Sequence, residues 1–276
     1  MILYKYVSFE AALTILKTKS LGFSHLEDFN DPFECTGFGF YDLDVPTSVA
    51  IGAFRNQFSR KYVILSLTRT ALNPLMWSHY GDSYKGVVIG IDTCKAGFED
   101  GDQFIIPSTK GELRYLKTAP KQANVASVEK LMSVGNSNIL NWDNEEVLIK
   151  HGLLYKMQEW AYEEEVRIVK NISDAQFGYH FSTKTHAYIN DQLWQRVQLQ
   201  TRPIYTLKLP EEAFVEVYVG KNAYIDLRRK QELVKPVIDH KVDQFELLKD
   251  LCIESNIGLK CISLDLETWA LKATPI

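Results

Sequence analysis

The segment spanning residues 159–169 constrains the fold most, because three consecutive glutamates stand directly before an apolar strand pattern. The alternation of Val, Ile and Val after the glutamates predicts a buried strand. Side chains alternate between the two faces of a strand. We therefore expect Glu163, Glu165 and Arg167 on one face and Glu164 on the other.

Two carboxylates and an arginine on one face are a costly cluster for a purely structural sheet. Such a cluster is expected at the mouth of a site that stabilises a developing positive charge. The alternative is a solvated strand edge with a local Glu–Arg pair, since most charge runs lie on the wet surface. The segment alone leaves both interpretations open.

Composition sets the broad class of the protein. The chain of 276 residues is long enough for one large or two small domains with a substantial core. Its net charge of -4 argues against a generalised nucleic-acid scaffold, which would be basic. No apolar run is long enough to span a membrane, and the first residues predict a strand rather than a signal peptide. Four widely spaced cysteines favour a reduced compartment. We expect a soluble, cytoplasmic protein without a membrane partner.

The order of elements predicts an α+β fold in a single domain, 1–276. Its core covers about 1–220, and a C-terminal helical and strand elaboration covers about 221–276. Strands are expected near 3–6, 21–24, 62–67, 86–91, 111–117, 163–169, 204–209, 214–219 and 260–264. Helices are expected after Ser8 and Asn73, and near 47–58, 120–160, 225–234 and 242–255. The uneven spacing of these elements argues against a regular βαβ series.

Two further segments have the character of a site. Asn30, Asp31 and Pro32 predict a rigid turn, which is equally consistent with an ordinary surface loop. Trp77 and Tyr80 share a helix face, where they could stack on a planar ring. For Trp77, packing against the sheet is the stronger interpretation. For Tyr80 the two interpretations are level.

Four blocks of sequence carry a resemblance to a known family. The blocks YKY, FNDPFE, MWSHY and YEEEVRIV stand in this order across residues 4–169. Together they resemble a bacterial family of domains of unknown function. This resemblance gives a family but little function.

The chain is also similar, more distantly, to the ADP-ribosyltransferase superfamily. That resemblance implies a mixed, split β-sheet flanked by helices, which clamps NAD in a cleft between its two halves. It places Lys5 at the first motif position, Ser66 or Tyr80 at the second, and the catalytic Glu165 at the third. Glu163 falls where many members carry a residue that orients the acceptor. Lys5 departs from the expected His or Arg, and its flexible point charge grips a cofactor differently.

The resemblance implies an enzyme that uses NAD as a substrate and needs no metal. Glu165 would stabilise the oxocarbenium charge that develops when the nicotinamide–ribose bond breaks, with Glu163 beside it. An aromatic face would stack on nicotinamide, and a cation would meet the pyrophosphate. The expected NAD-binding residues are Lys5, Tyr6, Asn30, Ser66, Trp77, Tyr80 and Arg167.

The acceptor would be a nucleic acid or a protein, contacted by the polar stretch 171–200. A toxin or phage-defence effector with an antitoxin or regulatory partner would suit such an enzyme. A metal-dependent nuclease built on Asp31, Asp92, Glu165 and Arg167 is an alternative, weakened by Arg at a Lys position. A non-catalytic binding or regulatory module on the same fold is a third hypothesis, which the Lys5 departure favours.

Overall fold

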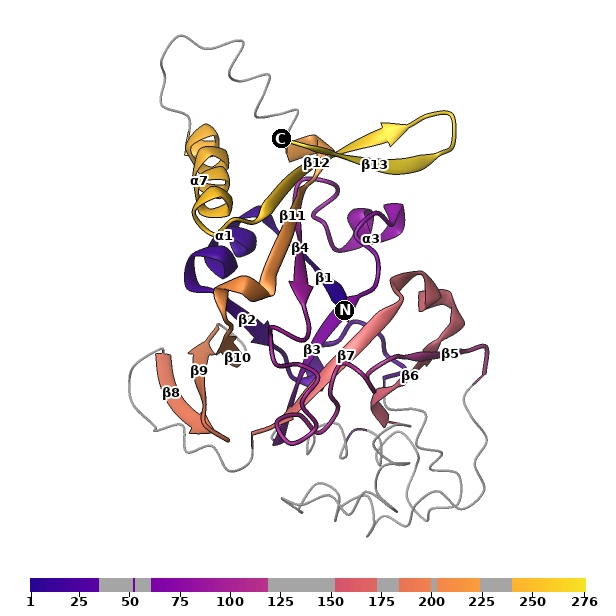
Figure 1. Ribbon diagram of the computed structural model, residues 1–276. Helices are drawn as coiled ribbons and strands as arrows, with labels where there is room; N and C mark the ends of the chain where they lie inside the picture. Colours follow the sequence, from indigo (N-terminus) through magenta and orange to yellow (C-terminus); the bar gives the residue numbers. More distant parts are fainter. Residues whose placement is uncertain (35–51, 53–60, 119–151, 173–183, 200–202, 224–239) are drawn as a thin grey trace. The chain divides into compact units, whose positions relative to one another are not determined.

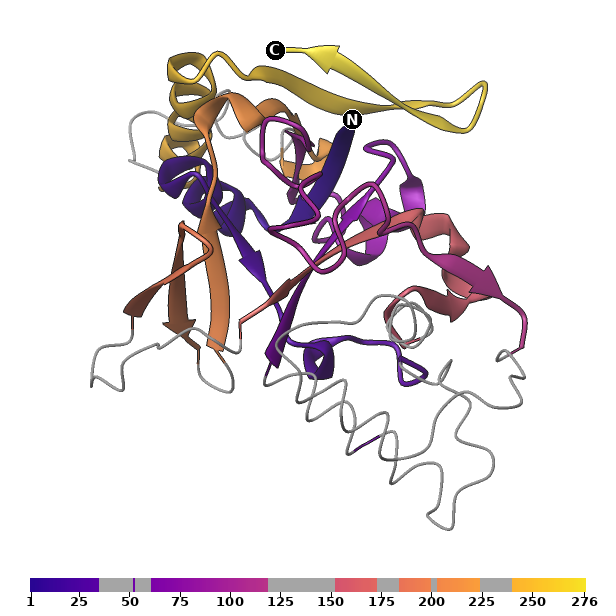
Figure 2. The same ribbon diagram turned by 60° about the horizontal axis from the view of Figure 1, so that its bottom comes forward.

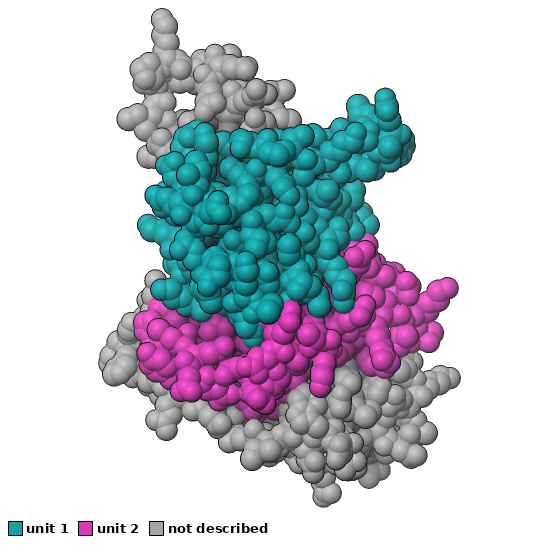
Figure 3. All heavy atoms as spheres, viewed as in Figure 1, with its two compact units in different colours: residues 1–21, 67–97, 208–276 teal, residues 22–66, 98–207 magenta. Residues whose placement is uncertain are grey.

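The computed structural model of the chain describes residues 1–34, 52, 61–118, 152–172, 184–199, 203–223 and 240–276 (Figure 1). Helices and strands of mixed order make this an α+β protein, as predicted. The chain divides into two compact units, each built from several segments (Figure 3). Unit 1 comprises residues 1–21, 67–97 and 208–276, and unit 2 comprises residues 22–66 and 98–207. The single-domain arrangement stays a prediction.

A mixed β-sheet forms the centre of unit 1. Its strands lie in the order β13-β12-β11-β4-β1, and β1 also pairs through Tyr4 with Thr68 at the end of β3. The β11–β12 pair is parallel, whereas the β12–β13, β11–β4 and β1–β4 pairs are antiparallel. These strands are β1 Ile2–Val7, β3 Tyr62–Thr68, β4 Val87–Asp92, β11 Phe214–Val219, β12 Gly258–Asp265 and β13 Ala270–Pro275.

Helices cover both sides of the unit 1 sheet. Helices α1 (Phe9–Thr18) and α7 (His240–Glu254) lie side by side, with α3 (Pro74–His79) on the other side (Figures 1 and 2). The Ser8 hydroxyl accepts a hydrogen bond from the Ala11 amide, which confirms the predicted N-cap of α1. A short 3-10 turn, η4 (Glu211–Ala213), precedes β11.

Unit 2 contains three groups of strands. Within it, β7 lies next to β3, β5 pairs in parallel with β6, and an antiparallel β10-β9-β8 group adjoins β2. Their bounds are β2 Ser20–Phe23, β5 Arg114–Leu116, β6 Tyr155–Met157, β7 Glu165–Asn171, β8 Lys184–Ile189, β9 Gln192–Gln198 and β10 Pro203–Lys208. Two 3-10 turns, η1 (Leu26–Asp28) and η3 (Gln158–Glu163), belong to the same unit.

An aromatic core supports unit 2. Phe23 lies with its ring centroid 4.9 Å from Trp194, 6.3 Å from Phe98 and 6.4 Å from Phe104. All four side chains are fully buried. Edge-to-face contacts, as with Phe98 and Trp194, and stacked contacts, as with Phe104, add to the free energy gained from burial alone.

The structure corrects the predicted strand at 163–169. The strand β7 begins only at Glu165, because Glu163 ends the 3-10 turn η3 and Glu164 adopts a left-handed conformation with φ 44°. Simple alternation therefore holds for Glu165 and Arg167 but not for the two preceding glutamates. The reversal at Glu164 nevertheless turns the Glu163 side chain inward, where it is buried.

Three other local predictions are wrong in part. The end of the predicted helix 120–160 is strand β6 followed by η3, while residues 119–151 lie outside the described chain. The stretch 171–200 contains the hairpin strands β8 and β9, since alternation there packs one face on the core. Strand β13 was missed. The predicted helices at 47–58 and 225–234 fall almost wholly outside the described residues.

Candidate functional site

Strand β7 places Glu165 and Arg167 on the same face, two residues apart and both buried. The Arg167 Nε donates to Glu165 Oε1 at 2.8 Å, and one terminal nitrogen reaches Glu165 Oε2 at 3.3 Å. The predicted Glu–Arg pair is therefore present. It is internal, so the solvated-edge alternative is wrong.

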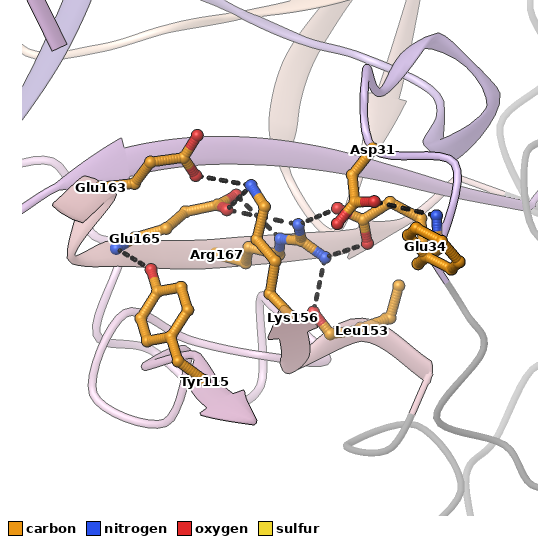
Figure 4. Close-up of polar contacts among 9 residues, drawn as sticks. Asp31, Glu34, Tyr115, Leu153, Lys156, Glu163, Glu165 and Arg167 are labelled. Carbon is orange, nitrogen blue, oxygen red and sulfur yellow. Dashed lines mark hydrogen bonds and ion pairs between the residues drawn. The ribbon is translucent and has the colours of Figure 1, made fainter. Parts of the chain in front are cut away.

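Arg167 also binds a glutamate far away in the sequence. Its two terminal nitrogens donate to Glu34 Oε1 at 2.6 Å and Oε2 at 2.9 Å, which is a bidentate pair (Figure 4). A further bond of 2.7 Å goes to the Leu153 carbonyl. A guanidinium has five N–H donors, and these five bonds engage all of them. The Phe29 ring lies 4.8 Å from the guanidinium carbon.

The predicted turn at residues 30–34 positions Glu34. The Asp31 Oδ1 accepts a hydrogen bond of 2.9 Å from the Phe33 amide, and the Asp31 carbonyl accepts one from the Glu34 amide. This is the Asx-type turn that the sequence indicates. Asp31 and Glu34 are buried, whereas Asn30 is exposed.

Lys156 links the two glutamates of the predicted catalytic pair. Its ammonium donates to Glu163 Oε2 at 2.5 Å and to Glu165 Oε2 at 3.0 Å (Figure 4). The Trp160 ring centroid lies 5.1 Å from the same ammonium. Lys156 on β6 therefore brings the two carboxylates together. Alternation had predicted instead that they share one face of a single strand.

Two hydroxyls complete the surroundings of Glu165. The Ser66 hydroxyl on β3 donates a hydrogen bond to the Glu165 carboxylate. The Tyr115 oxygen on β5 accepts the Glu165 amide hydrogen at 2.8 Å. Glu165 is thus held by its backbone and by its side chain, so its carboxylate is fixed in place.

Electrostatics keep this carboxylate charged. Burial by itself would raise the pKa of Glu165, but the charges of Arg167 and Lys156 outweigh burial and hold that pKa well below its usual range. Burial would likewise lower the pKa of Arg167, while Glu165 and Glu34 raise it above its usual value. The pKa of Lys156 is raised in the same way, chiefly by Glu165.

We use the name carboxylate cluster for five of these side chains: Glu34, Lys156, Glu163, Glu165 and Arg167. Its three carboxylates and two cations leave a net charge of -1. With this net negative charge, the cluster would attract a positively charged ligand. Three of its residues, Glu163, Glu165 and Arg167, were expected from the sequence, and the expected Ser66 lies on the neighbouring strand β3.

The other expected NAD-binding residues, Asn30 excepted, belong to unit 1. Trp77 is fully buried, donates its indole N–H to the Ala71 carbonyl at 2.8 Å, and lies 5.4 Å from the Tyr6 ring. This arrangement agrees with the packing interpretation of Trp77. Tyr80 caps the end of α3 and is partly exposed, and Lys5 pairs in register with Ile89. Their role in binding NAD stays a prediction.

The residues named for a nuclease do not form a metal site in the described chain. Asp92 belongs to unit 1, where its Oδ1 accepts from the Cys94 and Lys95 amides in a turn. Across the described residues no three His, Cys, Asp or Glu side chains are grouped to hold a metal ion. Among those residues there is likewise no helix long and apolar enough to cross a membrane.

The sequence reasoning missed three residues of the site. Glu34 stood in the FNDPFE block, and its position after a rigid turn was a usable signal. Lys156 and Tyr115 gave no signal, because neither has a distinctive neighbourhood in the sequence.

Of the expected acceptor segment 171–200, His186 on β8 contacts Gln195, and Tyr188 is exposed. Residues 173–183, with Tyr179 and His180, lie outside the described chain.

Comparison with known proteins places part of the chain in a family. Residues 76–168 match the model of DUF2971, a protein family of unknown function. This range includes the MWSHY block and nearly all of the YEEEVRIV block, while the other two blocks precede it. Searches of curated proteins and of solved structures gave no match. The chain therefore contains a DUF2971 domain at residues 76–168, which confirms the prediction of a domain-of-unknown-function family.

Proposed function

We propose that this protein is an NAD-dependent transferase of the ADP-ribosyltransferase type, in which Glu165 is the catalytic carboxylate. The observation that carries the proposal is that Glu165 is buried and is held in place by Arg167 and Lys156. The resemblance assigns Glu165 to the third, catalytic position of its motif, and Ser66 or Tyr80 to the second. Hydrogen bonding from Ser66 helps to lower the pKa of Glu165, as expected for two residues of one site.

The order of strands gives further support. Within unit 2, the strand that carries Ser66 lies next to the strand that carries Glu165. Within unit 1, the far end of β3 pairs with the strand that carries Lys5. An ADP-ribosyltransferase-like sheet, with its motif positions on neighbouring strands, is part of this proposal.

The reaction follows from the charge of Glu165. The bond between the ribose C1′ and the nicotinamide nitrogen breaks, and its electron pair leaves with the nicotinamide. Positive charge develops at C1′ and is stabilised by the ionised carboxylate. An acceptor oxygen or nitrogen then bonds to C1′ and loses its proton to water. Water as the acceptor gives ADP-ribose, and a macromolecule as the acceptor gives a modified product.

A second candidate is a non-catalytic binding or regulatory module. Its specific support is that all five donors of Arg167 are engaged within the protein. A carboxylate cluster with such complete internal pairing also serves as a structural clamp between the residue 30–34 turn and β7. This candidate predicts that the protein binds NAD but does not release nicotinamide from it.

Release of nicotinamide from NAD tests the proposal. The purified protein is incubated with NAD in the absence of metal, beside Glu165→Gln and Glu164→Gln variants. Glu164 is the matched control, because it is the exposed neighbour of the same chemical type. We expect release by the wild type and by Glu164→Gln, with a loss of about 100-fold or more in Glu165→Gln. Thermal unfolding checks that each variant is folded.

Other outcomes decide between the candidates. Equal release by Glu165→Gln and the wild type would refute the role of Glu165. Binding of NAD by the wild type without release would favour the module. The absence of both binding and release would overturn the transferase proposal.

A further inference from the structure

Two partly exposed aromatic side chains lie beside the carboxylate cluster. Trp160 and Tyr162 project from η3, with ring centroids 6.1 Å apart and planes inclined by 39°. The 3-10 turn η3 that contains them ends at Glu163, which accepts a hydrogen bond from Lys156. The two aromatic rings therefore form a partly exposed surface next to the proposed catalytic pair, Glu163 and Glu165.

The Trp160 ring already attracts a cation. The Lys156 ammonium lies 5.1 Å from its centroid, within the range of a cation–π interaction. Trp is the strongest aromatic partner for a cation, and Tyr is also favourable. The expected stacking residue of unit 1, Trp77, is fully buried and offers no such face.

Charge around these rings is negative. The carboxylate cluster carries a net charge of -1, and Glu159 adds an exposed carboxylate from the same turn. A negative surround and electron-rich rings attract a planar cation more than a neutral ring of the same shape. The nicotinamide ring of NAD is such a cation, because its nitrogen is bonded to ribose.

We propose that Trp160 and Tyr162 form the subsite for a planar, positively charged ring, which is the pyridinium end of NAD. The inference rests on the proposed function and names residues of the same site that neither the sequence motifs nor the family match assigns. The ring binds against the exposed part of the two aromatic side chains. Its glycosidic bond then lies towards Glu163 and Glu165.

A pair of small probes tests the subsite without turnover. 1-Methylnicotinamide is a planar cation, and nicotinamide is its neutral counterpart. Titration calorimetry with the full chain measures both affinities in the wild type, Trp160→Leu and Trp160→Phe. The control is Trp269→Leu, since Trp269 is 90% exposed on the β12–β13 turn of unit 1.

We expect the wild type to bind the cation about three- to tenfold more tightly than nicotinamide. Trp160→Leu removes that preference, Trp160→Phe keeps part of it, and Trp269→Leu leaves it unchanged. High salt reduces the preference, because exposed charges are screened. Equal affinity for the two probes in the wild type, or an unchanged preference in Trp160→Leu, overturns the subsite.

Failure of the subsite is distinguishable from failure of the proposed function. If the wild type releases nicotinamide from NAD but Trp160→Leu keeps the full preference, the ring binds elsewhere and the function stands. If the wild type prefers the cation but releases no nicotinamide, the subsite stands as a cation-binding surface and the transferase fails. If neither probe binds and no NAD is consumed, both proposals are wrong.

Discussion

Removal of the Arg167 guanidinium gives the sharpest test of how the carboxylate cluster works. Arg167→Met keeps the length and the apolar character of the stem but leaves Glu34 and Glu165 buried without this cation. Breaking a buried ion pair by removing one partner costs about 3–5 kcal/mol. For a protein of this size, that loss lowers the unfolding midpoint by roughly 5–9 °C.

The pH dependence of this variant should have the opposite sign to that of the wild type. In the wild type, the depressed pKa of Glu165 contributes stability above the unfolded value near 4.5, and that stability is lost as pH falls through the lower folded value. In Arg167→Met, burial of Glu165 without the guanidinium favours the protonated form, so the folded pKa of Glu165 rises. The variant then gains stability as pH falls from 7 towards 5.

Thermal unfolding at pH 5 and pH 7 measures both effects. Arg196→Met is the matched control, since Arg196 is partly exposed and donates to Gln198. Its midpoint should change by less than the equivalent of about 0.5 kcal/mol. The double variant Glu34→Met/Arg167→Met should lose less than Arg167→Met alone, because one orphaned carboxylate is removed. An Arg167→Met midpoint within 2 °C of the wild type, or one that falls between pH 7 and pH 5, would refute this account.

Three further changes are predicted, each measured by unfolding. Ser8→Ala removes the hydrogen bond to the Ala11 amide and should cost about 1 kcal/mol, whereas Ser8→Asp should retain most of the stability. Gly111→Ala would place a Cβ 1.9 Å from the Arg167 carbonyl oxygen, so we expect a loss above about 3 kcal/mol; a neutral result would contradict the close backbone approach. Burial lowers the pKa of Lys170 to about 8, so Lys170→Met should be more stable than the wild type at pH 7. That advantage should shrink as pH rises from 8 to 10, because the wild-type lysine then loses its charge. A difference in stability that stays constant over this pH range would contradict the lowered pKa of Lys170.

The ion pairs of the carboxylate cluster both position Glu165 and keep it charged. Complete pairing of Arg167 fixes the position of Glu165, and the two cations keep Glu165 ionised. A catalytic carboxylate needs both properties, since a group that must move or lose a proton first stabilises a transition state poorly. The same pairing stabilises the folded unit, so substitutions at Glu165 must be read for folding and for activity separately.

Local features of the sequence predicted several elements correctly. The cap at Ser8, the Asn73–Pro74 start of α3 and the Asp31 turn depend on hydrogen bonds between residues two or three apart. Such bonds form wherever those residue types stand at that spacing. The apolar run of β4 likewise predicted a strand buried on both faces, which the structure confirms.

Errors arose where a local rule met a constraint from elsewhere in the chain. Period-two alternation placed Glu163 on β7, but the left-handed turn at Glu164 ends η3 before that strand begins. The helical interpretation of residues 155–157 failed in the same way, because β6 forms by pairing with β5. Strand pairing of this kind depends on a partner that the local pattern does not reveal.

The sequence by itself determined the α+β class, the main apolar strands, the helix caps and the presence of a carboxylate pair near Arg167. Each of these depends on residue types at short spacing. Only the tertiary structure decided that Glu34 pairs with Arg167 across 133 positions, that Lys156 joins Glu163 to Glu165, and that Trp77 is buried. Those contacts join segments that are distant in the chain, and the free energy that selects them comes from burial and ion pairing in the folded units.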